Sequence, residues 1–519
     1  MLEEPRVQAL FADILRLDGE EDIIRLIDFV QDGSHELRDL LLVVPELLLH
    51  KKLRPAFTLA MLLRNNDYQN PILSGVLALG GWLYNNPREE RIGLELLRNQ
   101  ADAMRPEHRH LIHEEAFQPI LQPLLEMAIA QSSTPYTLKI FDIYQALFPE
   151  LRPLFDWDAP VPAFSLSEVR RRGHARARLL SPALPPPEIP RQRRRALVAM
   201  RHRFYFGNPA SRLSDFGPRI LAAMATYGWE VAGYNLQCAT QEELAEECQQ
   251  LVERCRQQRT DLLIIDLNIT LRAEARDAMI VQLRQENPAI RVVGCMIDTF
   301  CFDDTLILRA ARHLDLIWTR DVPARPLWQE PELTGKVLNL PIPHAGLLGT
   351  TEAPLNPAPL FSGGVSARYL PHRAFWLAAI QRAGLPVRVE ISPHLDDNLS
   401  PLDSFALYMQ RLSEATCCLS LSMRYDHSQV VTFRSFEVLL SGALLVQEAN
   451  GELPYYFIEG EHYLGFSSLS ELAGVLHFIA DHRKEAEAIR RAGHAFALAR
   501  YSDEMIIGQL EQRLFFPAG

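Results

Sequence analysis

The sequence has few cysteines, and none is placed for a metal site or a disulfide framework. Seven occur in 519 residues, without a CxxC pair and without the cysteine–histidine spacing of zinc sites. Cys417 and Cys418 stand side by side in an apolar run that is typical of a buried strand. We therefore expect no structural zinc and a reducing compartment.

The sequence also lacks an excess of positive charge. Its formal net charge is -12, with 53 Lys and Arg against 65 Asp and Glu. A general nucleic-acid binder needs a cationic surface that displaces counterions from phosphates. We therefore exclude nucleic acid as a partner, and any anion site has to be local.

Long apolar runs and a secretory leader are missing as well. The first residues, MLEEPRVQ, are acidic and lack the positive-then-apolar order of a signal peptide. One of the longest apolar stretches, LLLVVPELLL over residues 40–49, contains Pro and Glu and is far shorter than the roughly 20 residues of a membrane span. We expect a cytoplasmic protein without a membrane span.

The first part of the chain, residues 1–155, has the pattern of helices. Apolar residues recur at helical spacing, and breaks such as Asn65-Asn66-Asp67 interrupt the pattern without strand-like alternation. This predicts an all-helical domain of antiparallel pairs, either a bundle or a solenoid of the tetratricopeptide type, although no strict repeat period is found.

Residues 156–195 are rich in Pro and Arg, as in RRRGHARAR from Arg170 and PALPPPEIPRQRRR from Pro182. Consecutive prolines cannot continue a helix and favour an extended spacer. The sequence predicts a linker here, whose arginines either form a solvated tether or hold an acidic partner or a phosphate chain.

After residue 195 the pattern changes to alternating strands and helices, first over residues 196–345 and again over residues 346–519. Such alternation predicts parallel pairing with right-handed crossovers. The fold class is therefore α/β, with two Rossmann-like domains that follow an all-α domain and have a cleft between them.

The second α/β half contains QVVTFRSFEVLLSGALLVQEA, followed by GEHYLGFSSLSELAGVLHFIADHRKEAEAIRRAG. This passage resembles the carboxy-terminal half of CgeB-like and related GT-B glycosyltransferases, with an Arg, a Phe-Glu pair, a helix ending at Gly and a hydrophobic strand. The resemblance covers about residues 195–515 and leaves the helical part out. It implies the GT-B architecture and a nucleotide-sugar donor.

Arg434 and Glu437 fit donor-binding roles in this passage. A helix amino terminus stabilises a diphosphate, an Arg in the first turn offers paired donors to phosphate oxygens, and a Glu three residues later can accept ribose hydroxyls. The alternative is an ordinary surface ion pair between the two. Gln429 stands where a widespread retaining pattern has a second Glu, so inverting and retaining mechanisms both stay open.

Further donor-binding candidates follow predicted strands of the second half. They are Gly363 and Gly364, where the backbone can approach phosphates closely, and the cations Arg373 and Arg424. The resemblance favours Arg373 in the helix after the glycines. Gly207-Asn208 forms the corresponding loop of the first half, and a plain turn explains either loop equally well.

Asp298 is the candidate catalytic base. It ends a predicted strand, where open α/β sheets place ligand groups, and an inverting transferase needs a base for the acceptor hydroxyl. A helix cap is the alternative role, and Asp303 or Asp304 could replace it. The stretch around Asp266 also looks like a response-regulator receiver, but the required acidic pair and Lys are missing.

These observations predict transfer of a sugar from a nucleoside diphosphate donor, with no metal and no cofactor besides the donor. The helical domain would select the acceptor, and its similarity to bacterial protein glycosyltransferases favours a polypeptide and hence protein glycosylation. Two alternatives remain: a nucleotide-sugar epimerase of the same fold, and a scaffold that binds no nucleotide.

Overall fold

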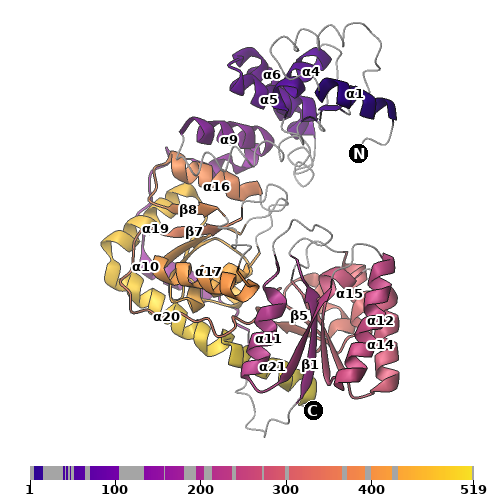
Figure 1. Cartoon of the computed structure of the whole chain (residues 1–519). Coiled ribbons are helices and arrows are strands. Elements are labelled where there is room, and N and C mark those ends of the chain that lie inside the picture. Colours follow the sequence, from indigo (N-terminus) through magenta and orange to yellow (C-terminus); the bar gives the residue numbers. More distant parts are fainter. Residues whose placement is uncertain are drawn as a thin grey trace.

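The computed structural model places three regions along the chain, a helical one and two parallel sheets (Figure 1). It describes residues 5–15, 39–40, 43–44, 47, 52–64, 71–103, 134–156, 158–180, 194–203, 213–236, 241–271, 274–297, 303–364, 371–391, 399–422 and 430–516. Among these residues no helix is both long and apolar enough to cross a membrane.

The described elements of residues 1–155 are all helical, as the sequence predicts. They are α1 (Pro5–Leu15), α4 (Leu53–Arg64), α5 (Pro71–Leu83), α6 (Pro87–Ala103), α9 (Thr134–Leu147) and the 3-10 helix η2 (Pro149–Phe155). A tight turn joins α5 to α6, and α6 approaches so closely that a Cβ at Gly93 would overlap the backbone of Ala78. Close backbone approach of this kind requires glycine.

The first sheet consists of six parallel strands in the order β2-β1-β3-β4-β5-β6. Its strands are β1 (Arg195–Arg201), β2 (Glu230–Leu236), β3 (Leu262–Asp266), β4 (Arg291–Met296), β5 (Leu316–Thr319) and β6 (Val337–Asn339). Its helices are α11 (Phe216–Thr226), α12 (Gln241–Gln258), α13 (Leu267–Thr270), α14 (Glu274–Glu286), α15 (Asp304–Ala311), η4 (Pro326–Gln329) and η5 (Pro331–Leu333).

The second sheet repeats this order with five parallel strands, β8-β7-β9-β10-β11. Its strands are β7 (Leu360–Gly363), β8 (Arg388–Ile391), β9 (Cys417–Ser420), β10 (Leu444–Glu448) and β11 (Leu464–Phe466). Its helices are α16 (Pro371–Arg382), α17 (Pro401–Ala415), α18 (Phe433–Leu440), η6 (Leu453–Tyr455), α19 (Leu469–Asp481), α20 (Arg483–Tyr501) and α21 (Asp503–Phe515). The predicted α/β class with two Rossmann-like sheets is confirmed, and Cys417 and Cys418 lie buried in β9.

At its carboxy-terminal end, the helical region packs against α16 and is therefore not a separate module. Phe141 of α9 stacks on Phe375 of α16 with ring centroids 4.6 Å apart, and Phe155 of η2 packs edge-on against Phe375 and Trp376. These aromatic rings belong to one hydrophobic core that continues into the second sheet. A boundary at residue 155 therefore cuts through a core, because the apolar surface of α16 is covered by α9 and η2.

The predicted linker over residues 156–195 differs from the structure. It contains the helix α10 (Leu166–Arg176), which begins with Ser165 capping the backbone N–H of Glu168. After α10 the chain stays attached, since Arg178 and Leu180 donate backbone hydrogen bonds to Pro454 and Tyr455. The Pro-Pro-Pro stretch falls in residues 181–193, outside the described residues.

The carboxy-terminal helix returns to the first half. Trp229 at the start of β2 donates a hydrogen bond of 2.6 Å from its indole to Glu511 of α21 and packs against Phe515. At the beginning of α21, the carboxylate of Asp503 accepts backbone hydrogen bonds from His344 and Gly346 in the segment that joins the two sheets. Residues 503–515 therefore pack on the first half, although they follow the second half in the chain.

Candidate anion-binding site

The strand order of the second sheet reverses between β7 and β9, and this is where open α/β sheets bind ligands. Ser362 and Ser420 lie near the carboxyl ends of these two strands, in neighbouring register positions because Leu360 pairs with Cys418. Both hydroxyl groups are buried and have no hydrogen-bond partner among the described residues. Buried polar groups normally have partners, so these two call for an explanation.

Arg434 lies in the first turn of α18 and reaches the same strand ends. A Cβ at Gly363 would overlap its guanidinium, so the absence of a side chain at Gly363 leaves room for Arg434 in this position. The guanidinium also lies over the ring of Phe361, 5.4 Å from its centroid. Its Nη1 is buried and unpaired within the described part of the chain. An unpaired buried donor costs free energy that an anionic ligand would recover.

Arg373 of α16 connects the carboxyl ends of β7 and β9. It is 7% exposed and donates from Nη1 to the carbonyl of Gly364 at 2.9 Å and from Nε to that of Leu421 at 3.2 Å. Burial, reinforced by the charge of Arg434, lowers the pKa of Arg373 to about 9, which still leaves the guanidinium charged at neutral pH. Two guanidinium groups therefore lie beside Gly363 and Gly364 at the end of β7.

Glu437 is not an exposed partner of Arg434. Its Oε2 accepts a hydrogen bond of 3.1 Å from the hydroxyl of Tyr408, which in turn accepts one of 3.4 Å from Nε of Arg434. Burial, together with the charge of Glu437, raises the pKa of Tyr408, so its phenol keeps the proton that it donates. The alternative of a surface ion pair between Arg434 and Glu437 is therefore excluded, because Tyr408 stands between them.

The other oxygen of Glu437 is held from the first half of the chain. Arg219 of α11 is 1% exposed and lies 3.3 Å from Oε1 of Glu437 and 3.1 Å from Asp215. It also donates to the carbonyl of Pro343 at 2.8 Å. A carboxylate offers about four acceptor positions, so Glu437 keeps capacity for ribose hydroxyls beside its two protein donors.

Arg320 connects the start of α18 with the end of β4. Its Nε donates to the carbonyl of Val431 at 2.9 Å, and its Nη1 donates to the carbonyl of Ile297. Asp298, the candidate base, lies outside the described residues, but its chain neighbour Ile297 is thereby tied to the segment that begins α18.

The two alternatives to Asp298 have structural roles on α15. Asp303 caps this helix by accepting hydrogen bonds of 2.8 Å from both the hydroxyl and the backbone N–H of Thr305, and these two bonds lower the pKa of Asp303. Asp304 forms an ion pair of 2.8 Å with Arg325. A lowered pKa makes Asp303 a weaker base.

Several candidates from the sequence fall outside the described residues. They are Arg424, Gln429, Gly207 and Asn208. Among the residues that are described, no three His, Cys, Asp or Glu side chains come together in a way that could hold a metal ion.

The receiver-like stretch has a different role. Asp266 is fully buried and forms a two-pronged ion pair with Arg201, at 2.7 Å from Nε and 3.1 Å from Nη2. It also caps α13 through the backbone N–H of Asn268. Its carboxylate is committed to these partners, which excludes Asp266 as a phosphate acceptor.

Tyr408 and Arg219 are members of this cluster that the sequence did not single out. Arg219 could have been noticed as a lone cation in the apolar helix FGPRILAAMAT, because a buried charge is kept only where it is paired. Tyr408 lies in an ordinary amphipathic helix, and no local pattern distinguishes it.

Residues 373–512 match the model of a family described as glycosyl transferase-like. The match covers α16 to α21 and includes Arg373, Arg434 and Glu437. The predicted resemblance to glycosyltransferases is confirmed over these residues, whereas the narrower CgeB-like resemblance is not tested by this match. No curated protein matches the sequence.

Solved structures of glycosyltransferases match this chain at low identity and with TM-scores below 0.5. Sucrose-phosphate synthase from Thermosynechococcus elongatus has 13% identity and a TM-score of 0.42, covering 62% of this chain and 99% of that chain. HepE from Anabaena, in complex with UDP-glucose, has 12% identity and a TM-score of 0.44, covering 61% and 98%. An O-GlcNAc transferase variant from Thermobaculum terrenum has 14% identity and a TM-score of 0.34, covering 98% and 96%.

Proposed function

We propose that this chain, whose residues 373–512 match the glycosyl transferase-like family, transfers a sugar from a nucleoside diphosphate to an acceptor nucleophile. One observation carries the proposal. At the switch point of the second sheet, Arg434 has a buried donor near Arg373. Among the described residues, neither this donor nor the buried hydroxyls of Ser362 and Ser420 have a hydrogen-bond partner. Groups that can donate hydrogen bonds and carry positive charge converge where a diphosphate would lie.

The diphosphate would bind against the first turn of α18. The partial positive charge of the helix amino terminus adds to the two guanidinium charges. Together they stabilise the charge that develops on the leaving diphosphate, the role that a metal ion has in other transferases. Glu437 would accept the ribose hydroxyls beside Tyr408 and Arg219.

A panel of nucleoside diphosphates in a thermal-shift assay tests the proposal. A ligand that binds the native state raises the unfolding temperature by mass action, so the nucleoside diphosphate that does so identifies the nucleobase of the donor. No shift with any nucleoside diphosphate would support the scaffold alternative. Conversion of the donor without an acceptor into a second nucleotide sugar would identify the epimerase.

Asp298 is the proposed base for the acceptor. The variant Asp298→Asn keeps the shape and removes the proton acceptor, so turnover should fall on the order of 100-fold with donor affinity little changed. Steady-state kinetics with the identified donor measures both quantities. A variant with nearly full turnover would assign the role elsewhere, and Asp303→Asn and Asp304→Asn would then be compared.

The proposed acceptor is a polypeptide held by the helical region. The attachment of this region supports the proposal, because α9 and η2 pack on α16, the helix that carries Arg373. An acceptor bound by residues 1–155 would therefore be positioned relative to the donor, and positioning of this kind lowers the barrier to transfer.

A further inference from the structure

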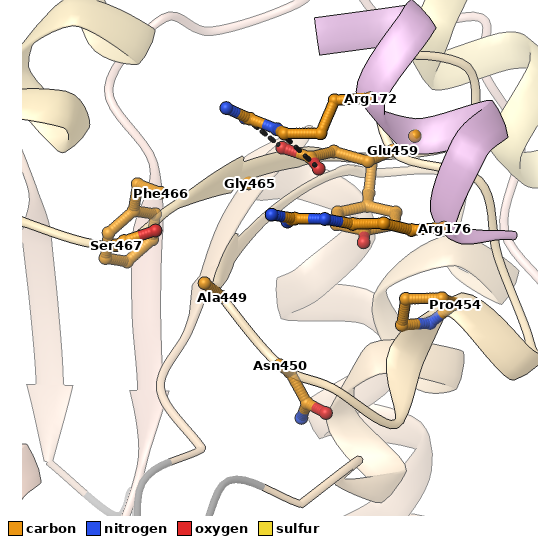
Figure 2. A pocket seen from close by; sticks show the side chains of 11 residues that line it. Arg172, Arg176, Ala449, Asn450, Pro454, Glu459, Gly465, Phe466 and Ser467 are labelled. Atoms are coloured by element: carbon orange, nitrogen blue, oxygen red, sulfur yellow. Dashed lines mark hydrogen bonds and ion pairs between the residues drawn. The ribbon is translucent and has the colours of Figure 1, made fainter.

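A polar pocket lies at the carboxyl edge of the same sheet, at the ends of β10 and β11 (Figure 2). Asn450 follows β10 and Ser467 follows β11, while the opposite wall comes from α10. The pocket therefore includes the arginine-rich stretch of the predicted linker, which has no part in the donor site.

Residues of α10 and of the loop at Glu459 to Glu461 hold the two segments together. A Cβ at Gly173 would overlap the carbonyl of Glu459, so this helix can lie against the loop only with glycine there. Arg170 donates from Nε to the carbonyl of Gly460 at 3.1 Å, and His174 lies 2.7 Å from the carboxylate of Glu461. The wall that α10 provides is therefore fixed.

Two arginines of α10 line the pocket, and among the described residues only Arg172 has an acidic partner. Arg172 pairs with Glu459, with Nη2 2.7 Å from Oε1 and Nε 3.4 Å from Oε2. Arg176 lies one helical turn further and has no ion pair or hydrogen bond with any residue that the structure describes. Figure 2 shows its guanidinium between the Arg172–Glu459 pair and Asn450. The pocket keeps one net positive charge.

The remaining polar groups of the pocket can donate hydrogen bonds. Tyr463 is 4% exposed, and within the described residues its hydroxyl has no partner. Burial raises the pKa of Tyr463, so the hydroxyl keeps its proton, and the charge of Arg176 is close enough to act on it. The side-chain oxygen of Asn450 accepts from the N–H groups of Glu452 and Leu453. Its amide nitrogen donates one N–H to the hydroxyl of Ser422 at 3.4 Å and has a second N–H to offer.

We infer that this pocket is a second anion site, separate from the donor site, and that it binds a phosphate group. A guanidinium, a phenol, an amide and the hydroxyl of Ser467 surround one small space, and several donors around a single cation suit a tetrahedral oxyanion. A bound phosphate would join α10 to the ends of β10 and β11, and so would fix the chain that leads from the helical region to the first sheet.

Calorimetric titration of the full chain with inorganic phosphate tests this inference. Wild type is expected to bind phosphate. Arg176→Gln should raise the dissociation constant on the order of tenfold, as expected for loss of a charge-assisted contact. Tyr463→Phe should raise it as well. The matched control is Arg171→Gln, on the same helix with a side chain that is 78% exposed, and it binds like wild type. Glucose 6-phosphate is the second probe: tighter binding identifies a phosphorylated metabolite, and equal binding identifies free phosphate.

Arg434→Gln separates this pocket from the donor site, because it should leave phosphate binding intact. The inference is overturned if wild type shows no heat of binding with phosphate up to about 10 mM, a concentration far above the dissociation constant of a functional site. It is also overturned if Arg176→Gln binds like wild type, or if Arg434→Gln abolishes phosphate binding. Nucleoside diphosphate titrations on the same proteins report on the proposed function independently.

Discussion

At the scale of single residues, His462 is a histidine that folding keeps neutral. It is 6% exposed, its Nδ1 accepts the backbone N–H of Ile458 at 3.0 Å, and its ring stacks on Phe496. Burial lowers the pKa of His462 to about 4. Between pH 6.5 and 4 the unfolded chain binds this proton and the folded chain does not, so stability falls as the pH falls through this window.

His462→Gln should therefore reduce the acid sensitivity of the protein. On going from pH 7 to pH 5, wild type should lose about 2 kcal/mol more of its free energy of unfolding than the variant. Urea unfolding at the two pH values measures this difference. His477→Gln, at an exposed position on α19, should lose as much as wild type. Equal acid sensitivity of His462→Gln and wild type would contradict the assignment.

Local sequence could identify individual site residues but not their partners. Arg434 and Glu437 are three positions apart on one helix, and the turn of that helix places them together. The partners that decide their state, Tyr408 and Arg219, are 26 and 218 positions away from Arg434 and Glu437 respectively. These contacts depend on the packing of α17 and α11, which no local pattern encodes.

At the scale of elements, α9 and η2 cover the apolar side of α16. A variant that lacks residues 1–155 would expose Phe375 and Trp376, which are at most 1% exposed in the full chain. Exposure of one large aromatic side chain costs about 1.5–3 kcal/mol. We therefore expect this variant to aggregate or to unfold at clearly lower urea concentration than the full chain.

The matched control lacks residues 1–133 and keeps α9 and η2. It should retain cooperative unfolding nearer to that of the full chain, because Phe141 and Phe155 still cover α16. Urea unfolding followed by circular dichroism compares the two variants. Equal stability would mean that the helical region is an independent module, as the sequence predicts.

Element order was predictable because strands and helices differ in period. Buried strands such as β3 and β10 also begin with a short run of consecutive apolar residues. Helix α10 was not predictable in this way. It buries only Val169 and Gly173, so its amphipathic signal is weak among many arginines. Its helical state depends on docking against Glu459 and Gly460, which are almost 290 positions away.

At the scale of the whole molecule, Arg219 joins the two halves. Its guanidinium contacts Asp215, Glu437 and the carbonyl of Pro343 in the connecting segment. Arg219→Met would leave two buried carboxylates without this cation, which typically costs about 3–5 kcal/mol. The midpoint of urea unfolding should fall accordingly.

A second substitution separates charge from packing. In the Arg219→Met background, Glu437→Gln removes one unpaired charge while Tyr408 can still donate to the amide oxygen. The double variant should therefore regain part of the lost stability. A double variant less stable than Arg219→Met would show that the ion pair between the halves is not what holds Glu437 in place.

The two α/β halves were predictable from sequence, but their joining was not. Asp503 of α21 holds the backbone of His344 and Gly346, and nothing near Asp503 in the sequence points to that segment. His344 is fully buried and is kept neutral, because burial and the charge of Arg219 lower its pKa. It belongs to the segment that joins the two sheets.

Titration of the Arg434→Ala variant with the nucleoside diphosphate identified in the thermal-shift panel tests the central claim most directly. If Arg434 binds the diphosphate, the folded variant should bind about 1.5–3 kcal/mol more weakly than wild type, the range for a charge-assisted hydrogen bond. Arg491→Ala, on the exposed face of α20, should bind like wild type. Unchanged affinity of the folded Arg434→Ala variant would contradict a donor site at the ends of β7 and β9.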